Sequence, residues 1–304
     1  MMPILVGLRP TLGRSLVRDF DEHNITDAVI DRFGDTPDPR LKAILDSLVH
    51  HLHDFVRDVE PTFDEWIAAI GFLTRTGQMC SETRQEFILL SDTLGVSMLV
   101  DAINHRMPEG ATETTVLGPF YLDNAPHFAS GADIAVGMAG EPLYCEVAIS
   151  SANGTPLAGA IVDVWQSDSE GFYDVQRTDL DESKLRGRFT ADDQGILRFW
   201  TITPTAYPIP HDGPVGQMLI ATNRHPWRPA HLHFMITAAA HEPLVTHVFV
   251  DGDQYLESDA VFGVKNSLVD PYPVQAPGVA PDGRVMDGRW RRLDYKFGLK
   301  PMPA

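Results

Sequence analysis

The chain has 304 residues, 43% hydrophobic and 22% charged, which is typical of a soluble globular protein with one large domain or two smaller ones. The formal net charge of -18 argues against a nucleic-acid partner, because binding a phosphate backbone needs a basic patch. Two cysteines, Cys80 and Cys145, make no disulfide framework, and the apolar start of the chain is too short for a membrane span. We therefore expect a cytoplasmic protein that is not a membrane protein.

Residues 1–105 have helical patterns. From Leu41 to Val59 apolar residues recur with a period near 3.6, which predicts an amphipathic helix. The apolar positions are Leu41, Ile44, Leu45, Leu48, Leu52, Phe55, Val56 and Val59.

Three further helices are marked by local signals. Asn24 precedes one helix start, and Thr62 with Glu65 has the form of a capping box before another. A run that begins at Ser81 predicts a helix broken or bent near Gly95. Because no catalytic constellation is visible here, we expect a structural or dimer-forming helical layer.

Strand patterns dominate after residue 106, where we expect a domain boundary. Residues 1–105 would form a helical linker or dimerisation domain, and residues 106–304 a mainly β, β-sandwich domain with a C-terminal tail. The tail after Pro271 is rich in Pro and Gly and is expected to cover the surface. The predicted strands span residues 143–149, 160–166, 196–202, 218–221, 231–236 and 245–250.

One predicted strand carries two histidines in the order Arg-Pro-Ala-His-Leu-His. Successive side chains of a strand point to opposite faces, so His231 and His233 share a face. Two neutral imidazoles at this spacing are suited to one metal ion, and Arg228 adds a fixed positive charge. The alternative is a strand whose polar face carries histidines with no metal.

Two tyrosines stand at irregularities marked by Gly or Pro, close to predicted strand ends. Tyr173 follows Gly171, and Tyr207 precedes Pro208. Taken singly, each could be an amphipathic ring with its hydroxyl in water.

The motifs Gly-x-Tyr at 171–173, Tyr-Pro-Ile-Pro at 207–210 and Arg-Pro-Ala-His-x-His at 228–233 occur in the order of a known family. Between about residues 87 and 268 the chain resembles the intradiol ring-cleaving dioxygenases, the catechol 1,2-dioxygenase superfamily. The resemblance implies a non-haem Fe(III) cofactor with four protein ligands, namely Tyr173, Tyr207, His231 and His233.

The chemistry of these residue types agrees with ferric iron, a hard ion whose charge two phenolates partly neutralise. Zinc would more often recruit Cys or a carboxylate. Asp168 stays open as the carboxylate of a ferrous site, although the resemblance favours tyrosine. The resemblance implies that Tyr207 leaves the metal and takes a proton, while Arg228 stabilises negative charge on the substrate carbon.

Within the superfamily the chain is most similar to the hydroxyquinol 1,2-dioxygenases, on residues 89–92, 116–120 and 207–216. These enzymes use O2 to convert benzene-1,2,4-triol to 3-hydroxy-cis,cis-muconate, the enol of maleylacetate, in aromatic compound catabolism. We expect the Asp92 carboxylate to accept a hydrogen bond from the third hydroxyl. The expected pocket residues are Leu89, Asp92, Val116, Gly118, Pro119, Phe120, Ile209, Pro210, Arg228 and Val261, each of which could instead be ordinary core.

Several alternatives stay open. A catechol or chlorocatechol 1,2-dioxygenase would share the iron site and differ in the pocket, and a transthyretin-like β-sandwich would bind without catalysis. The chain departs from catechol-type members at His247, where they usually carry glutamine beside the reaction centre. The family also implies a homodimer through the helical part, sometimes with a bound phospholipid.

Overall fold

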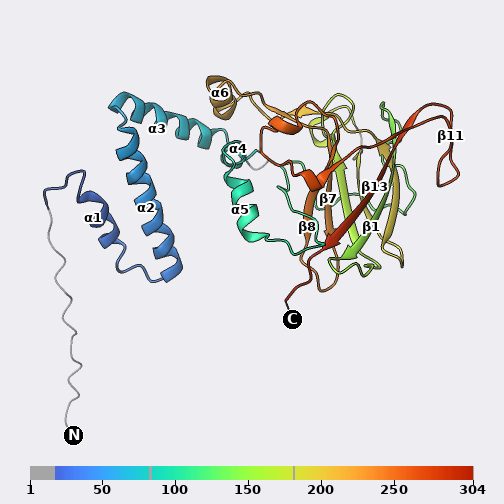
Figure 1. The fold of residues 1–304 in the computed structure, drawn as a ribbon. Coiled ribbons are helices and arrows are strands. Elements are labelled where there is room, and N and C mark those ends of the chain that lie inside the picture. Colours follow the sequence, from blue (N-terminus) through green and yellow to red (C-terminus); the bar gives the residue numbers. More distant parts are fainter. Residues whose placement is uncertain (1–17, 82–83, 181, 304) are drawn as a thin grey trace, which may run out of the picture. The chain divides into compact units, whose positions relative to one another are not determined.

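The computed structural model describes residues 18–81, 84–180 and 182–303 (Figure 1). The chain divides into two compact units between Gly71 and Phe72. The domain boundary predicted near residue 106 stays a prediction. Among the described residues, no helix has the length and apolar character needed to span a membrane.

Helix starts in the first unit follow their local signals. The carboxylate of Asp38 accepts the N–H groups of Arg40 and Leu41, and Pro39 occupies the first helical turn of α2. The predicted Thr62–Glu65 capping box at α3 is confirmed, since each side chain accepts the other residue's N–H. The helices here are α1 (Ile25–Arg32), α2 (Pro39–Val59) and α3 (Phe63–Gln78), which runs on into the second unit.

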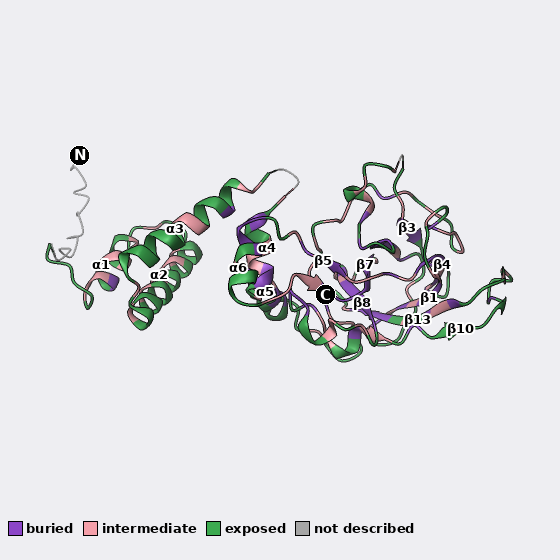
Figure 2. Ribbon diagram, turned by 90° about the horizontal axis from the view of Figure 1, so that it is seen from above, coloured by how far each residue is buried: buried purple, intermediate pink, exposed green. Residues whose placement is uncertain are grey.

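The predicted amphipathic helix is confirmed as α2, and most of its residues are exposed, coloured green in Figure 2. No residue of α2 is buried. About half of each side chain on its apolar face is accessible, at Leu41, Ile44, Leu48, Leu52, Phe55, Val56 and Val59.

Helices α4 (Glu86–Thr93) and α5 (Val96–Asn104) confirm the predicted break at Gly95. Gly95 has a φ of 74°, a left-handed conformation that glycine adopts readily. Buried Glu86 of α4 accepts the N–H of Val215 and so joins α4 to α6.

One predicted strand is wrong. Met218–Ala221 forms the end of helix α6 (Pro214–Ala221). Pro214 lies in the first helical turn after Gly213, and both favour a helix start. A short apolar run has no periodicity that separates a strand from a buried helix.

The β part is a sandwich of two sheets, so the predicted mainly β fold class is confirmed. One sheet has the order β3-β2-β7-β8-β9 and the other β10-β13-β1-β4. Their facing side chains form one core that includes Val147, Val162, Phe199, Phe234 and Phe297. The long strands are β1 (Pro142–Ser151), β2 (Ile161–Gln166), β3 (Arg186–Thr190), β4 (Ile196–Ile202), β7 (His231–Thr237), β8 (Leu244–Val250) and β13 (Trp290–Leu299).

The expectation that the tail covers the surface is wrong for its last part. Strand β13 pairs in parallel with β1 along nine residues and lies inside the four-stranded sheet. Leu293, Phe297 and Leu299 are fully buried, while charged residues between them face the other side. The shorter segments are β5 (Tyr207–Pro208), β6 (Trp227–Arg228), β9 (Val269–Asp270), β10 (Val274–Gln275), β11 (Gly278–Val279), β12 (Val285–Met286), η1 (Asp174–Gln176), η2 (Leu256–Ser258) and η3 (Asn266–Leu268).

Candidate metal centre

Strand β7 brings the two predicted histidines together. His231 and His233 are each 1% exposed, and their Nε2 atoms lie 3.1 Å apart. In the sheet His233 lies opposite Trp165 of β2 and His247 of β8. The indole of Trp165 stacks on His233 with ring centroids 4.6 Å apart and fixes the plane of that imidazole.

The hydrogen bonds of His231 assign its protons. Its Nδ1 lies 2.7 Å from the carbonyl oxygen of Pro229, which can only accept, so Nδ1 carries the proton. Burial lowers the pKa of His231 to about 3, and the charge of Arg228 adds to the effect. The ring is therefore neutral and directs an Nε2 lone pair into the cluster, as a metal ligand requires.

His247 is a third imidazole in this cluster. Its Nδ1 lies 2.7 Å from Oγ1 of Thr115, and its buried Nε2 has no hydrogen-bond partner in the described part of the chain. Burial lowers the pKa of both His233 and His247 well below the usual value. One ligand atom from each of His231, His233 and His247 lies within 4.8 Å of the others, so the three could hold a metal ion.

Tyr173 enters the cluster from the loop before η1. Its hydroxyl lies 3.0 Å from Nε2 of His233, and Phe120 stacks on its ring at 4.4 Å between centroids. Burial raises the pKa of Tyr173 well above 10, with a further contribution from Tyr207. A cation beside the hydroxyl would reverse that preference and stabilise the phenolate.

Buried Arg186, which belongs to none of the predicted motifs, fixes the loop that carries Tyr173. It pairs with Asp174, the next residue after Tyr173, and donates from Nη1 to the carbonyl of Phe120 at 2.9 Å. The sequence signal for Arg186 was its place in the strand-like stretch Arg-Gly-Arg-Phe-Thr. That stretch does not indicate that the partners of Arg186 are Asp174 and Phe120.

Tyr207 and Arg228 face each other across the two-stranded ribbon of β5 and β6. Nη1 of Arg228 lies 3.5 Å from the Tyr207 hydroxyl, and Asp259 pairs with Nε and Nη2 of the guanidinium at 3.0 and 3.2 Å. Although burial would lower the pKa of Arg228, the Asp259 carboxylate raises it overall. Arg228 therefore stays charged while it is 3% exposed.

Gly118, a predicted pocket residue, lies against the His233 ring. It has a φ of 76°, and a Cβ here would lie 3.2 Å from Cε1 of His233. Both the backbone conformation and the limited space beside the His233 ring therefore favour glycine.

Some of the predicted apolar pocket residues pack together in the structure. Ile209 and Val261 belong to one buried cluster with Leu89 packed against it. Burial raises the pKa of Asp92 in α4, although the Ser97 hydroxyl and the charge of Arg228 act in the opposite direction. For Val116 and Pro210, which are half-buried, and Pro119, which is exposed, a place in the pocket stays a prediction.

Asp168, the alternative carboxylate ligand of a ferrous site, has its carboxylate oxygens bonded to the turn before Tyr173 and to Arg177. It accepts the N–H groups of Glu170 and Phe172 and pairs with Arg177 at 2.9 Å. These bonds hold the turn that leads to Tyr173.

Fold and site together define a β-sandwich protein with a buried set of nitrogen and oxygen donors, suited to a metal ion, beside a fixed guanidinium. The family model for the dioxygenase domain matches residues 116–300, and the model for the catechol dioxygenase N terminus matches residues 38–112. The chain belongs to the catechol dioxygenase family of intradiol ring-cleaving enzymes.

Relatives cover nearly the whole chain. The 6-chlorohydroxyquinol 1,2-dioxygenase of Cupriavidus pinatubonensis is 53% identical over 94% of this chain and 99% of its own length. The hydroxyquinol 1,2-dioxygenase of Nocardioides simplex is 48% identical over 92% and 96%. The structure of a hydroxyquinol 1,2-dioxygenase from Pseudomonas putida has a TM-score of 0.88 at 49% identity and covers 92% of this chain and 98% of that one.

Proposed function

We propose that this chain cleaves hydroxyquinol (benzene-1,2,4-triol) with O2 between its two adjacent hydroxylated carbons. The product is 3-hydroxy-cis,cis-muconate, the enol of maleylacetate, and the reaction belongs to aromatic compound catabolism. The observation that carries this proposal is the buried cluster of two tyrosines and two histidines beside Arg228, in which the Tyr207 ring centroid lies 5.2 Å from that of Tyr173 and 5.5 Å from that of His231. The names of the relatives at 48% and 53% identity support hydroxyquinol or a chlorinated form of it as substrate.

In the proposed site Tyr173, Tyr207, His231 and His233 hold Fe(III). The donor set suits a hard cation, because phenolate oxygens reduce its charge and the neutral His231 offers a lone pair at Nε2. Bound Fe(III) supplies a Lewis-acidic, redox-active centre for the two hydroxyl oxygens of a vicinal diol. A contact of His247 with the metal or with a group bound beside it is part of the proposal, supported by ligand atoms of His231, His233 and His247 that lie within 4.8 Å of one another.

The protein's own groups divide the remaining work. The phenolate oxygen of Tyr207 would accept a proton of the diol and become a hydroxyl, and the protonated Arg228 next to it would stabilise negative charge on the substrate carbon. Trp165 and Phe120 cover His233 and Tyr173 and exclude water from them.

Asp92 is proposed to select the substrate. Its buried carboxyl lies on the same short helix as Leu89, which packs against the Ile209–Val261 cluster. A third hydroxyl on the ring would give this carboxyl a hydrogen-bond partner that catechol lacks.

Oxygen uptake by iron-loaded protein tests the proposal. Benzene-1,2,4-triol, catechol and 4-chlorocatechol are compared side by side, with the triol corrected for its autoxidation. Preference for the triol supports the proposal, and preference for a catechol keeps the iron site but overturns the pocket assignment. No uptake with any of the three contradicts the proposed activity, and protein that loads no iron favours a non-catalytic sandwich.

We further propose that the enzyme is a cytoplasmic homodimer, with residues 1–105 as its linker and dimerisation domain and residues 106–304 as its catalytic domain. The exposed apolar face of α2 supports a second copy as partner, and a phospholipid is proposed at the helical interface. The free thiols of Cys80 and Cys145 are compatible with a reducing compartment. Mass spectrometry of an organic extract of the purified protein tests for the lipid.

A further inference from the structure

The Arg228 guanidinium is held by the Asp259 carboxylate, which also accepts hydrogen bonds from the backbone of its own loop. Oδ1 and Oδ2 of Asp259 pair with Arg228 and also accept the N–H groups of Val261 at 3.3 Å and Gly263 at 2.9 Å. Asp259 is 5% exposed, so all four bonds form away from water. The loop of residues 259–263 therefore folds around its own carboxylate.

Gly263 leaves the space that this arrangement needs. A Cβ at this position would lie 2.9 Å from Nη2 of Arg228 and 3.2 Å from Oδ2 of Asp259. Its φ lies outside the left-handed region, so the requirement for glycine comes from the close approach of the guanidinium and not from the backbone conformation.

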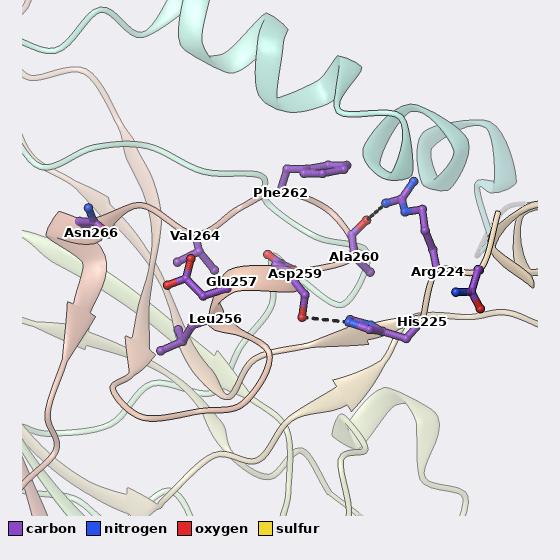
Figure 3. Close-up of a pocket in the computed structure, with 11 residues that line it drawn as sticks. Arg224, His225, Leu256, Glu257, Asp259, Ala260, Phe262, Val264 and Asn266 are labelled. Atoms are coloured by element: carbon purple, nitrogen blue, oxygen red, sulfur yellow. Dashed lines mark hydrogen bonds between the residues drawn. The ribbon is translucent and has the colours of Figure 1, made fainter.

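The other side of the loop is anchored to α4. Arg224 donates to the carbonyl of Ala260 at 3.1 Å (Figure 3) and also to that of Thr93, the last residue of α4, at 2.6 Å. The guanidinium of Arg224 also lies 5.1 Å from the ring centre of Phe262, which has a φ of 59°. A non-glycine residue in this conformation persists only where its surroundings fix it.

We infer that Asp259 is a positioning residue: its carboxylate directs the Arg228 guanidinium toward Tyr207 and fixes Val261 in the pocket wall. The Asp259 carboxylate thus both balances the charge of the Arg228 guanidinium and sets its orientation. A small movement of the 259–263 loop would turn Arg228 away from Tyr207 while Tyr173, His231 and His233 stay in place. The kinetic meaning of this inference rests on the proposed function, but the orientation of Arg228 does not.

We call the Asp259 carboxylate with its bonds to Arg228, Val261 and Gly263 the Asp259 clamp, and two variants disturb it by different routes. Asp259→Asn removes the charge with little change in shape, and Gly263→Ala keeps the charge but pushes a methyl group against Arg228. The matched controls are Glu257→Gln, an exposed neighbour, and Gly288→Ala, whose Cβ would meet nothing within 4 Å. All four proteins are loaded with iron and compared with wild type on benzene-1,2,4-triol.

We expect kcat to fall about tenfold or more in both clamp variants while KM changes by less than about threefold, because an interaction that acts on developing charge is lost. Iron content and the visible tyrosinate band should match wild type. Asp259→Glu, which retains the charge, should recover part of kcat. Wild-type kcat in both clamp variants, or equal loss of kcat in the two controls, would overturn the inference.

Crystal structures give a readout that does not depend on turnover. In Asp259→Asn and Gly263→Ala, Nη1 of Arg228 should move away from the 3.5 Å it keeps from the Tyr207 hydroxyl. An unmoved guanidinium in both variants contradicts the positioning role even if activity falls. Wild-type protein that cleaves none of the three diols contradicts the proposed function instead, and the displacement of Arg228 still decides the role of Asp259.

Discussion

The imidazoles of His231 and His233 are each fixed by one neighbouring group whose interaction allows a single arrangement of the ring. The carbonyl of Pro229 can only accept, so it sets the tautomer of His231, and the Trp165 indole sets the plane of His233. Such supporting contacts fix the orientation of the proposed metal ligands in the protein without a metal. Substitutions beside the proposed ligands should therefore weaken metal binding even though the ligands themselves are unchanged.

Gly118→Ala should lower iron content. The added Cβ would lie 3.2 Å from Cε1 of His233 and displace that ring. Gly131→Ala is the matched control, because Gly131 also has a positive φ but a Cβ there would meet nothing within 4 Å. Both variants should lose about 1 kcal/mol of stability from the backbone, and only the first should lose iron by metal analysis. Equal iron content in the two would contradict this prediction.

Asp92→Asn should raise stability at neutral pH and weaken substrate selection. Burial raises the pKa of Asp92 against the opposing effects of Ser97 and Arg228, with Asp259 as a further negative charge. A raised carboxyl pKa means that the native state binds the proton more strongly than the unfolded chain. Ionisation therefore costs stability, and the cost grows as pH rises above the unfolded pKa of about 4.

The measurement for Asp92→Asn is thermal unfolding at several pH values, together with the ratio of kcat/KM for benzene-1,2,4-triol and catechol. The variant should melt above wild type at pH 7, with a smaller difference near pH 4, and its preference for the triol should fall about tenfold or more. Asp287→Asn, at an exposed site, is the control. An unchanged preference would remove Asp92 as the discriminating residue.

At the scale of elements, strand β13 was predicted as part of a surface tail although its sequence carries the pattern of a strand. Leu293, Phe297 and Leu299 alternate with charged residues in the two-residue period of a half-buried strand. The residues just before β13 are rich in Pro and Gly, which favours a surface loop, and this composition led to the wrong prediction for the whole tail. The parallel pairing of β13 with β1 depends on contacts about 150 residues away, which no local pattern reveals.

Elements with a strong local pattern were predictable. The periodicity of α2, the capping box of α3 and the alternation around His231 and His233 each depend on nearby residues. The supporting contacts were not predictable, because Asp259 pairs with Arg228 across 31 positions and Arg186 donates to the Phe120 carbonyl across 66. Motif order placed the predicted ligands in one cluster, while their supporting residues became visible only in three dimensions.

Phe297→Ala in β13 should destabilise the second unit strongly. The ring is fully buried in the core of the sandwich, so its removal leaves a cavity and should cost about 3–5 kcal/mol. Lys296→Ala, the exposed neighbour on the opposite face, should cost little. Urea unfolding measures both, and similar midpoints for the two variants would contradict the place of β13 in the core.

At the scale of the whole molecule, the exposed apolar face of α2 predicts self-association. Leu52→Asp puts a charge in the middle of that face and should yield monomers, whereas His50→Asp on the opposite face should not. Light scattering after size-exclusion chromatography measures the mass. Monomeric wild-type protein, or two variants that behave alike, would contradict the proposed dimer.

The pairing of β13 with β1 also sets an order of events during synthesis. All of the proposed iron ligands leave the ribosome well before Leu299, yet the sheet behind them stays incomplete until β13 inserts beside β1. Pairing across such a sequence distance is slow, because a long loop must close before any contact forms. Until β13 pairs with it, β1 is an edge strand of its sheet, and we therefore expect partly synthesised chains to expose the unpaired backbone groups of β1.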